Sequence, residues 1–170
     1  MRAIQKKLLC TDSRYNIEKA TDDETLRTKD GIPIIWHRHI LDVPKGFTFY
    51  LAHEFFDALP IHQFQKTENG WREVMVDLDK DINGPHHLKF CLAPSNTLAT
   101  VLIPEDAKGE FLEIRPQAQI IVKNMAETIQ KHGGCSLIVD YGDLTCDRNT
   151  LRAFKNHQMS NPLLEPGNSD

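Results

Sequence analysis

The sequence predicts a mixed α/β fold in which a parallel sheet carries an inserted antiparallel region. Two short apolar runs, at residues 47–52 and 135–139, each stop at polar and acidic residues, a pattern typical of strands covered on both faces. The second run follows the clearest helical pattern, at residues 116–132, and a helix that leads into a buried strand is half of a βαβ unit. Between the two runs, Asn69-Gly70 separates two alternating segments and predicts an antiparallel hairpin.

The composition is that of a soluble globular protein. The chain has 170 residues, of which 40% are hydrophobic and 26% charged, and its net charge is -4. No basic stripe interleaved with aromatic residues occurs, so we expect no nucleic-acid partner. No apolar run approaches the roughly 20 residues that span a bilayer, so we expect no membrane span. The cysteines are widely spaced without a CxxC pair, which predicts free thiols at Cys10, Cys91, Cys135 and Cys146.

The first 60 residues are expected to form the N-terminal part of the sheet. Residues 1–10 have apolar positions at helical spacing, residues 11–30 are polar and acidic like a loop, and residues 31–36 are a short β-rich run. The apolar run at residues 47–52 follows a Pro44-Lys45-Gly46 turn and is expected to be the organising strand. The next segment, residues 54–60, can be interpreted as a short helix, because Glu54 and Asp57 would favour its N-terminus.

The two remaining parts of the chain are predicted to differ in kind. Residues 61–114 read as an antiparallel insertion, with strands at 61–66, 71–78, 88–93 and 111–114. Residues 115–157 supply the helix at 116–132, which begins at Pro116 and ends at Gly133-Gly134, then the buried strand and a further short helix at 150–157. Residues 158–170 form a Pro- and Gly-containing tail without a packed ending.

Three carboxylates that come after the two buried strands form the candidate site. If the strands are neighbours, Glu54, Asp57 and Asp140 line one rim at their carboxyl ends, where ligands of open α/β sheets bind. Such a rim suits a cation, and a guanidinium matches it best because its fork donates two parallel hydrogen bonds to a carboxylate. Helix capping together with a surface turn remains the competing interpretation.

Other sequence patterns support no metal site, phosphate loop or nucleophile. The pair His53-Glu54 has Asp57 where a zinc helix of the HExxH type needs its second histidine, and the remaining histidine pairs, His37 with His39 and His86 with His87, lack a third ligand. No GxGxxG, GxxxxGK[ST] or GxSxG occurs in the sequence.

These residues also carry a family resemblance. The segments LAHEFFDALPIHQF, GWREVMVDLD, GGCSLIVDYGD, TLRAFKNH and PLLEPG resemble, in that order and over residues 1–170, the MidA family of mitochondrial complex I assembly factors. The resemblance implies a class I S-adenosylmethionine methyltransferase fold, Rossmann-like, with residues 47–52 and 135–139 as its fourth and fifth strands. It also implies methylation of an arginine on a complex I core subunit, in the mitochondrial matrix.

The resemblance assigns roles to five residues. Glu54 and Asp57 would be catalytic, and His53, Asp140 and Tyr141 would contact S-adenosylmethionine. Members of the family commonly have asparagine at the position of His53. The chain departs further from the family in lacking the glycine-rich cofactor loop and the acidic residue that holds the ribose, both expected before Met1.

The whole chain is therefore expected to be an incomplete methyltransferase domain, the middle of a longer enzyme. Its function has two competing hypotheses. The chain belongs to an S-adenosylmethionine-dependent protein arginine methyltransferase, or it is a truncated, catalytically silent form that acts at most as an interaction module through residues 61–78.

Overall fold

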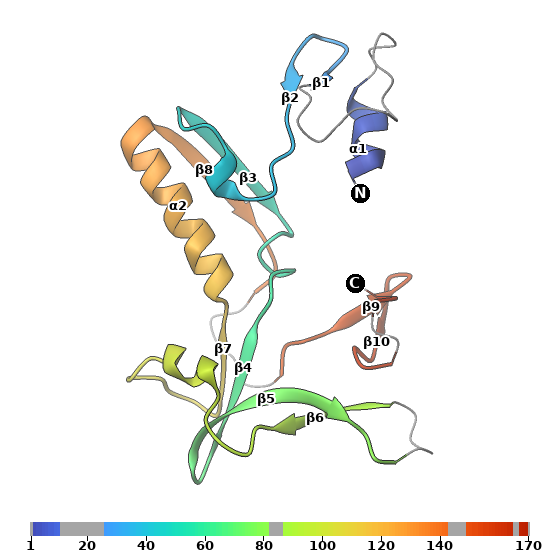
Figure 1. Ribbon diagram of the computed structural model, residues 1–170, viewed down its shortest axis with the longest axis vertical. Coiled ribbons are helices and arrows are strands. Elements are labelled where there is room, and N and C mark those ends of the chain that lie inside the picture. The colour runs from blue at the N-terminus through green and yellow to red at the C-terminus, as the bar shows by residue number, and fades with distance from the viewer. Residues whose placement is uncertain (1, 11–25, 82–86, 143–148, 165–166, 170) are drawn as a thin grey trace. The chain divides into compact units, whose positions relative to one another are not determined.

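The computed structural model describes residues 2–10, 26–81, 87–142, 149–164 and 167–169 (Figure 1). The chain forms two compact units, Met1–Phe47 and Thr48–Asp170. In the described residues, no helix is long and apolar enough to cross a membrane.

The first unit is small. It contains helix α1 (Arg2–Leu9), strands β1 (Leu26–Arg27) and β2 (Pro33–Ile34), which pair antiparallel, and the 3-10 helix η1 (Ile40–Asp42). The predicted helix at residues 1–10 is confirmed over the described residues. Most of the loop predicted at residues 11–30 lies outside the described residues, and its end forms β1 instead.

The second unit contains the predicted parallel strands. Strand β3 (Thr48–His53) pairs in parallel with β8 (Gly134–Val139), and helix α2 (Pro116–His132) packs against both. The helix has the predicted bounds, because Pro116 supplies its first turn and Gly133, at φ 81°, ends it. Gly134 is required where β8 begins: a Cβ there would lie 2.0 Å from the Thr48 carbonyl oxygen.

The predicted antiparallel region is also present in the second unit. Its sheet has the order β6 (Leu88–Leu92), β5 (Gly70–Leu78), β4 (His62–Thr67) and β7 (Phe111–Ile114). The hairpin of β4 and β5 turns at Glu68-Asn69, and Gly70 takes the left-handed conformation at φ 87°. The antiparallel hairpin predicted from the Asn69-Gly70 pair is thus confirmed.

One face of this sheet carries the core of the unit. Phe64 is 1% exposed and clusters with Ala99 and Ile114, beneath the 3-10 helix η2 (Leu98–Leu102). The buried carboxylate of Glu73 connects this helix to the sheet, since it accepts hydrogen bonds from Thr97 Oγ1 and from His62 Nδ1, the latter at 2.6 Å. A buried carboxylate is tolerated in such a place only when donors of this kind surround it.

Two predictions about the second unit are wrong, and one of the interpretations left open does not occur. Strands β3 and β8 are not covered on both faces, because α2 packs on the pair while Phe49 and Leu51 are 73% and 74% exposed. Residues 54–60 form a turn without a helix, so Glu54 and Asp57 do not cap one. The short helix expected at residues 150–157 is replaced by a hairpin of β9 (Ala153–Lys155) and β10 (Gln158–Ser160).

The expected tail is also partly structured. Strand β10 lies within it, and Leu163 is buried at 8% exposure. The hairpin that precedes Leu163 turns at Asn156 and His157, whose φ values of 53° and 61° are those of a tight two-residue turn with both residues left-handed. The chain therefore packs some of its C-terminal residues instead of leaving them as an extended tail.

Candidate active site

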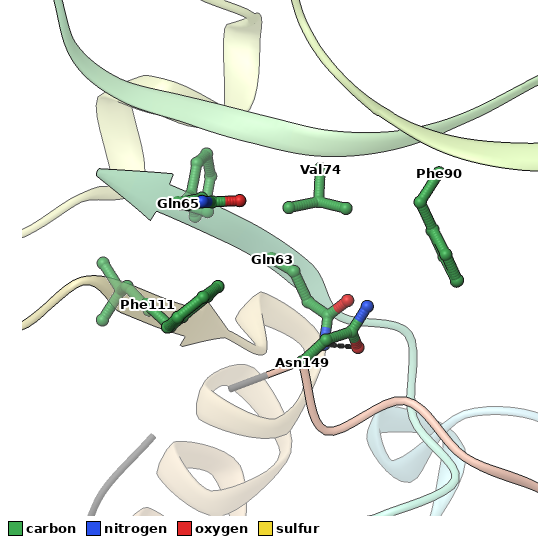
Figure 2. Close-up of a pocket in the computed structure, with 8 residues that line it drawn as sticks. Gln63, Gln65, Val74, Phe90, Phe111 and Asn149 are labelled. Atoms are coloured by element: carbon green, nitrogen blue, oxygen red, sulfur yellow. Dashed lines mark hydrogen bonds between the residues drawn. The ribbon is translucent and has the colours of Figure 1, made fainter. Parts of the chain in front are cut away.

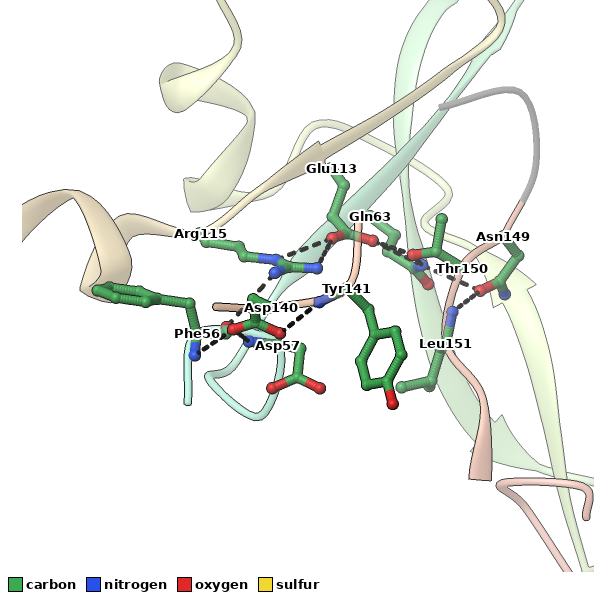
Figure 3. Close-up of polar contacts among 10 residues, drawn as sticks. All are labelled: Phe56, Asp57, Gln63, Glu113, Arg115, Asp140, Tyr141, Asn149, Thr150 and Leu151. Carbon is green, nitrogen blue, oxygen red and sulfur yellow. Dashed lines mark hydrogen bonds and ion pairs between the residues drawn. The ribbon is translucent and has the colours of Figure 1, made fainter. Parts of the chain in front are cut away.

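The polar residues after β3 and β8 lie at one edge of the parallel pair. His53 pairs with Val139 at the last position of the register, and the Glu54 N–H donates to the Val139 carbonyl at 2.9 Å. The first residue after β8, Asp140, then meets the turn after β3 (Figure 3). The two predicted strands are neighbours, and the rim inferred from the sequence forms because parallel strands end at the same edge.

Asp140 organises this rim through its carboxylate. One oxygen, Oδ2, accepts the backbone N–H of Phe56 at 2.9 Å and of Asp57 at 3.2 Å, and the other accepts the Tyr141 N–H at 2.8 Å. Partial burial raises the pKa of the Asp140 carboxyl, but the donors on Tyr141, Asp57 and Phe56 favour the charged form and bring that pKa below its ordinary value. Asp140 is therefore a carboxylate at neutral pH, held by main-chain donors.

The turn after β3 presents the other predicted residues to solvent. Glu54 and Asp57 are exposed, as is His53 at the end of β3, whereas Phe56 between them is buried at 9% exposure. Glu54 has φ 46°, a left-handed conformation that is uncommon for a residue with a side chain. The buried Phe56 ring thus anchors a turn whose two carboxylates are exposed, and the Asp57 side chain also interacts with Asp140.

Tyr141 continues the same edge. Its side chain is 72% exposed, and it comes directly after Asp140. An exposed aromatic ring beside hydrogen-bonding groups at the carboxyl end of parallel strands is a suitable surface for a nucleoside. His53, Glu54, Asp57, Asp140 and Tyr141, the five residues assigned from the sequence, therefore lie on one rim of the second unit.

Two further residues of the rim were missed by the sequence interpretation. Arg115 donates from Nη1 to the Phe56 carbonyl at 3.4 Å, and its Nε donates to Glu113 at 2.9 Å (Figure 3). The first of these contacts joins positions 59 residues apart, so no local pattern reveals it. The one available signal is the place of Arg115, between the strand at 111–114 and the helix that begins at Pro116.

Glu113 connects Arg115 to the antiparallel sheet. Its carboxylate also accepts hydrogen bonds from Thr150 Oγ1 and from Gln63 Nε2, the latter at 3.4 Å. Burial raises the pKa of the Glu113 carboxyl, but the Thr150 hydroxyl, the Arg115 guanidinium and the Gln63 amide together lower it below its ordinary value. Glu113 is thus charged at neutral pH and holds Arg115 by a charge-assisted hydrogen bond.

A small pocket lies on the sheet face next to this network. It has a volume of about 150 Å³, and Gln63 Nε2 donates to Asn149 Oδ1 at 2.9 Å at its rim (Figure 2). Apolar and amide side chains line it: Gln63, Phe64, Gln65, Val74, Phe90, Phe111, Leu112 and Asn149. None of the five predicted site residues lines this pocket.

Metal ligands do not gather at the rim. In residues 2–10, 26–81, 87–142, 149–164 and 167–169, no group of three or more His, Cys, Asp or Glu side chains could hold a metal ion. Three of the cysteines are free thiols, at Cys10, Cys91 and Cys135, as predicted, and Cys146 lies outside the described residues. His86 lies outside them as well.

Comparison with known proteins shows which family the chain is similar to. A family model described as "Putative S-adenosyl-L-methionine-dependent methyltransferase" matches residues 1–170. Among curated proteins, the rat mitochondrial protein arginine methyltransferase NDUFAF7 is 48% identical over 143 residues, which cover 84% of this chain and 32% of the relative. The human protein of that name is 46% identical over 143 residues, with the same coverage.

The bovine protein of that name is similar over more of the chain. It is 43% identical over 166 residues, which cover 96% of this chain and 37% of the relative. The chain thus spans about a third of the length of these curated relatives. Because the family model matches from the first residue to the last, the chain belongs to this family of S-adenosyl-L-methionine-dependent methyltransferases.

Proposed function

We propose that this chain carries the substrate-binding rim of an S-adenosylmethionine-dependent protein arginine methyltransferase. The observation that carries the proposal is the turn after β3, where the exposed Glu54 and Asp57 stand beside Asp140 at the carboxyl edge of a parallel pair. A guanidinium is the cation that such carboxylates bind with the best geometry. The names of the relatives, which are protein arginine methyltransferases, agree with that substrate class.

The fold proposed for this activity is the Rossmann-like sheet of class I methyltransferases. The parallel pairing of β3 with β8, with α2 packed on the pair, supports it. The four antiparallel strands from β4 to β7 are then an insertion between the two parallel strands. In open sheets of this kind, ligands bind beyond the carboxyl ends of the strands, where the rim lies.

His53, Asp140 and Tyr141 are proposed to face the cofactor. The exposed Tyr141 ring and the polar groups beside it fit a nucleoside, while the sequence supplies no glycine-rich loop, so these residues fit part of the cofactor. S-adenosylmethionine, when bound, supplies an electrophilic methyl group on a sulfonium. The chain's own contribution at this edge is to orient that ligand toward the turn.

Glu54 and Asp57 are proposed to orient the guanidinium and to receive its proton. When the methyl group moves from the sulfonium sulfur to the guanidinium nitrogen, the carbon–sulfur bond would break to leave a thioether and the nitrogen would give up a proton. A carboxylate that already accepts the N–H of that nitrogen would be placed to take the proton. Holding the nitrogen in line with the methyl group removes the entropic cost of finding that geometry during the reaction. The negative charges of Glu54 and Asp57 also attract a cationic substrate from a distance.

The partner and the compartment are proposed from the relatives and the resemblance. A protein substrate agrees with the names of the relatives, which are also called mitochondrial. The resemblance of the sequence to complex I assembly factors makes a complex I core subunit the proposed substrate and the mitochondrial matrix the proposed site of action.

A second function is supported by a different surface. Met75, Val76 and Leu78, near the end of β5, are exposed apolar side chains, and such groups on a strand are suited to a protein partner. The alternative is therefore a catalytically silent chain that interacts through residues 61–78. Isothermal titration of the folded chain with S-adenosylmethionine separates the two functions: saturable micromolar binding supports the enzyme, and a folded chain without binding supports the interaction module.

Glu54→Gln tests the catalytic assignment. The amide keeps the shape of the carboxyl but removes its charge, so we expect arginine methyl transfer to fall about a hundredfold, which corresponds to the ~2 to 3 kcal/mol of a hydrogen bond to a charged group. Affinity for S-adenosylmethionine is expected to stay within about twofold, because a lost guanidinium contact leaves the cofactor's contacts in place. Glu68→Gln, in the exposed hairpin turn, is the matched control. Equal methyl transfer by the two variants would remove Glu54 from the site.

A further inference from the structure

The turn that carries Glu54 and Asp57 is held from two sides by charged side chains. Asp140 Oδ2 accepts the N–H of Phe56 at 2.9 Å and of Asp57 at 3.2 Å, and Arg115 Nη1 donates to the Phe56 carbonyl at 3.4 Å (Figure 3). Both polar backbone groups of Phe56 therefore bind side chains that are distant in the sequence, one directly after β8 and one directly before α2. These contacts join residues 84 and 59 positions apart.

The conformation of the turn explains why such support is needed. Glu54 has φ 46°, where a side chain is disfavoured, and residues 54–60 form no helix. Within the turn, the Leu59 N–H donates to the Phe56 carbonyl at 3.3 Å, which leaves the amides of Phe56 and Asp57 to another acceptor. Glu54 has a backbone hydrogen bond to Val139, but the amide donors of Phe56 and Asp57 are given to Asp140. Without that acceptor, the positions of the two exposed carboxylates would be set by a turn with fewer constraints.

Arg115 is itself prevented from competing with a substrate guanidinium. Its Nε and Nη2 donate to Glu113 Oε1, so the side chain is turned toward Glu113, and Nη1 reaches the Phe56 carbonyl. Glu113 in turn accepts hydrogen bonds from Thr150 and Gln63, which fix it on the antiparallel sheet. The Arg115 guanidinium thus supports the backbone of the turn and does not bind Glu54 or Asp57.

We propose that Asp140 is a positioning residue that holds the Glu54–Asp57 turn in its guanidinium-binding conformation, with Arg115 as the second support. The guanidinium part of this inference rests on the proposed function. In this role the Asp140 carboxylate acts through main-chain amides and does not itself bind the substrate. The lowered pKa of Asp140 agrees with the role, since amide donors favour the charged form.

The first test follows the amide protons of Phe56 and Asp57 by NMR as pH is lowered. Both signals should shift with one midpoint, below the ordinary aspartate pKa, because both amides bind the same carboxylate oxygen. The shift with that shared midpoint should be absent in Asp140→Asn, where only the response to the Asp57 carboxyl itself remains, and unchanged in the exposed control Asp106→Asn. Persistence of the shared-midpoint shift in Asp140→Asn, or its absence in the unsubstituted chain, overturns the inference.

Hydrogen exchange of the same amides at neutral pH tests the role of Asp140 without protonating its carboxylate. We expect the Phe56 and Asp57 amides to exchange at least tenfold faster in Asp140→Ala, and to an intermediate degree in Asp140→Asn, which keeps one neutral acceptor. The amides of β3 and β8 report whether each variant remains folded. Unchanged exchange at Phe56 and Asp57 in a folded Asp140→Ala variant overturns the inference.

The last test titrates N-acetyl-arginine methylamide into the same proteins and monitors the signals of Glu54 and Asp57. We expect affinity to fall at least tenfold in Asp140→Ala, less in Asp140→Asn, and not at all in Asp106→Asn. Equal affinity in the unsubstituted chain and Asp140→Ala overturns the positioning role. If the unsubstituted chain fails to bind the probe, the proposed arginine function fails, and the amide titration alone decides whether Asp140 fixes the turn.

Discussion

Carboxylates of the second unit differ in role because their surroundings differ. Asp140 and Glu113 each accept several hydrogen bonds, from backbone amides in one case and from side chains in the other. Glu54 and Asp57, in contrast, project from an exposed turn. A carboxylate surrounded by donors fixes structure, whereas an exposed carboxylate with a fixed backbone is available to a ligand.

Stability should depend on pH through the two carboxylates whose pKa is lowered. Asp140 and Glu113 have folded-state pKa values below the ordinary 3.8 and 4.5, so their contribution is complete above those values and is lost as pH falls through the folded-state pKa. We therefore expect the free energy of unfolding to fall between about pH 5 and pH 2. Urea unfolding at several pH values should show a shallower fall in Asp140→Asn than in Asp106→Asn. Equal slopes for these two variants would mean that Asp140 gains no stabilising donors on folding.

Pairing of β3 with β8 depends on a glycine. A side chain at Gly134 would meet the Thr48 carbonyl oxygen at 2.0 Å, and its φ of 127° is strained for any other residue. Gly134→Ala should therefore lower the free energy of unfolding by about 2 to 4 kcal/mol, from backbone strain and overpacking together. Gly142→Ala is the control, because open space surrounds that position, and its effect should stay below about 1 kcal/mol. Similar urea midpoints for the two variants would show that β8 does not begin against Thr48.

Elements with strong local signals were predictable from the sequence. Pro116 at the start and Gly133-Gly134 after the end explain the bounds of α2. The residues at its turn explain the β4–β5 hairpin. The β9–β10 hairpin was mistaken for a helix because its turn residues, Asn156 and His157, adopt the left-handed conformation without a glycine. The turn at residues 54–60 could be interpreted as a helix because Glu54 and Asp57 are residues that favour a helix N-terminus, whereas the contact of Asp140 with the amides of Phe56 and Asp57, 84 and 83 positions away, has no local signal.

The arrangement of the candidate site was predictable to the extent that it depends on strand ends. Glu54, Asp57 and Asp140 come after parallel neighbours, so a general rule for open sheets brings them together. The contributions of Glu113 and Arg115 depend on contacts between elements, which composition and periodicity do not encode. Burial of the strands was overestimated for a related reason: an apolar run shows that a strand can be covered, but it does not show how many faces the rest of the chain covers.

At the scale of the molecule, the exposed face of β3 and β8 should bind a hydrophobic dye. Leu51 and Leu137 are register partners, 74% and 59% exposed, so they form a contiguous apolar surface on one side of the pair.

Replacing both with lysine should reduce the fluorescence of bound 8-anilinonaphthalene-1-sulfonate. The free energy of unfolding should change by only about 0.5 kcal/mol per site, because exposed side chains contribute little to folding. Leu98→Lys, at a position 94% exposed on η2, is the control and should leave most of the signal. An equal loss of dye fluorescence in the control would mean that exposed apolar side chains bind the dye independently. A loss confined to Leu51 and Leu137 would show that the parallel pair presents one continuous apolar face.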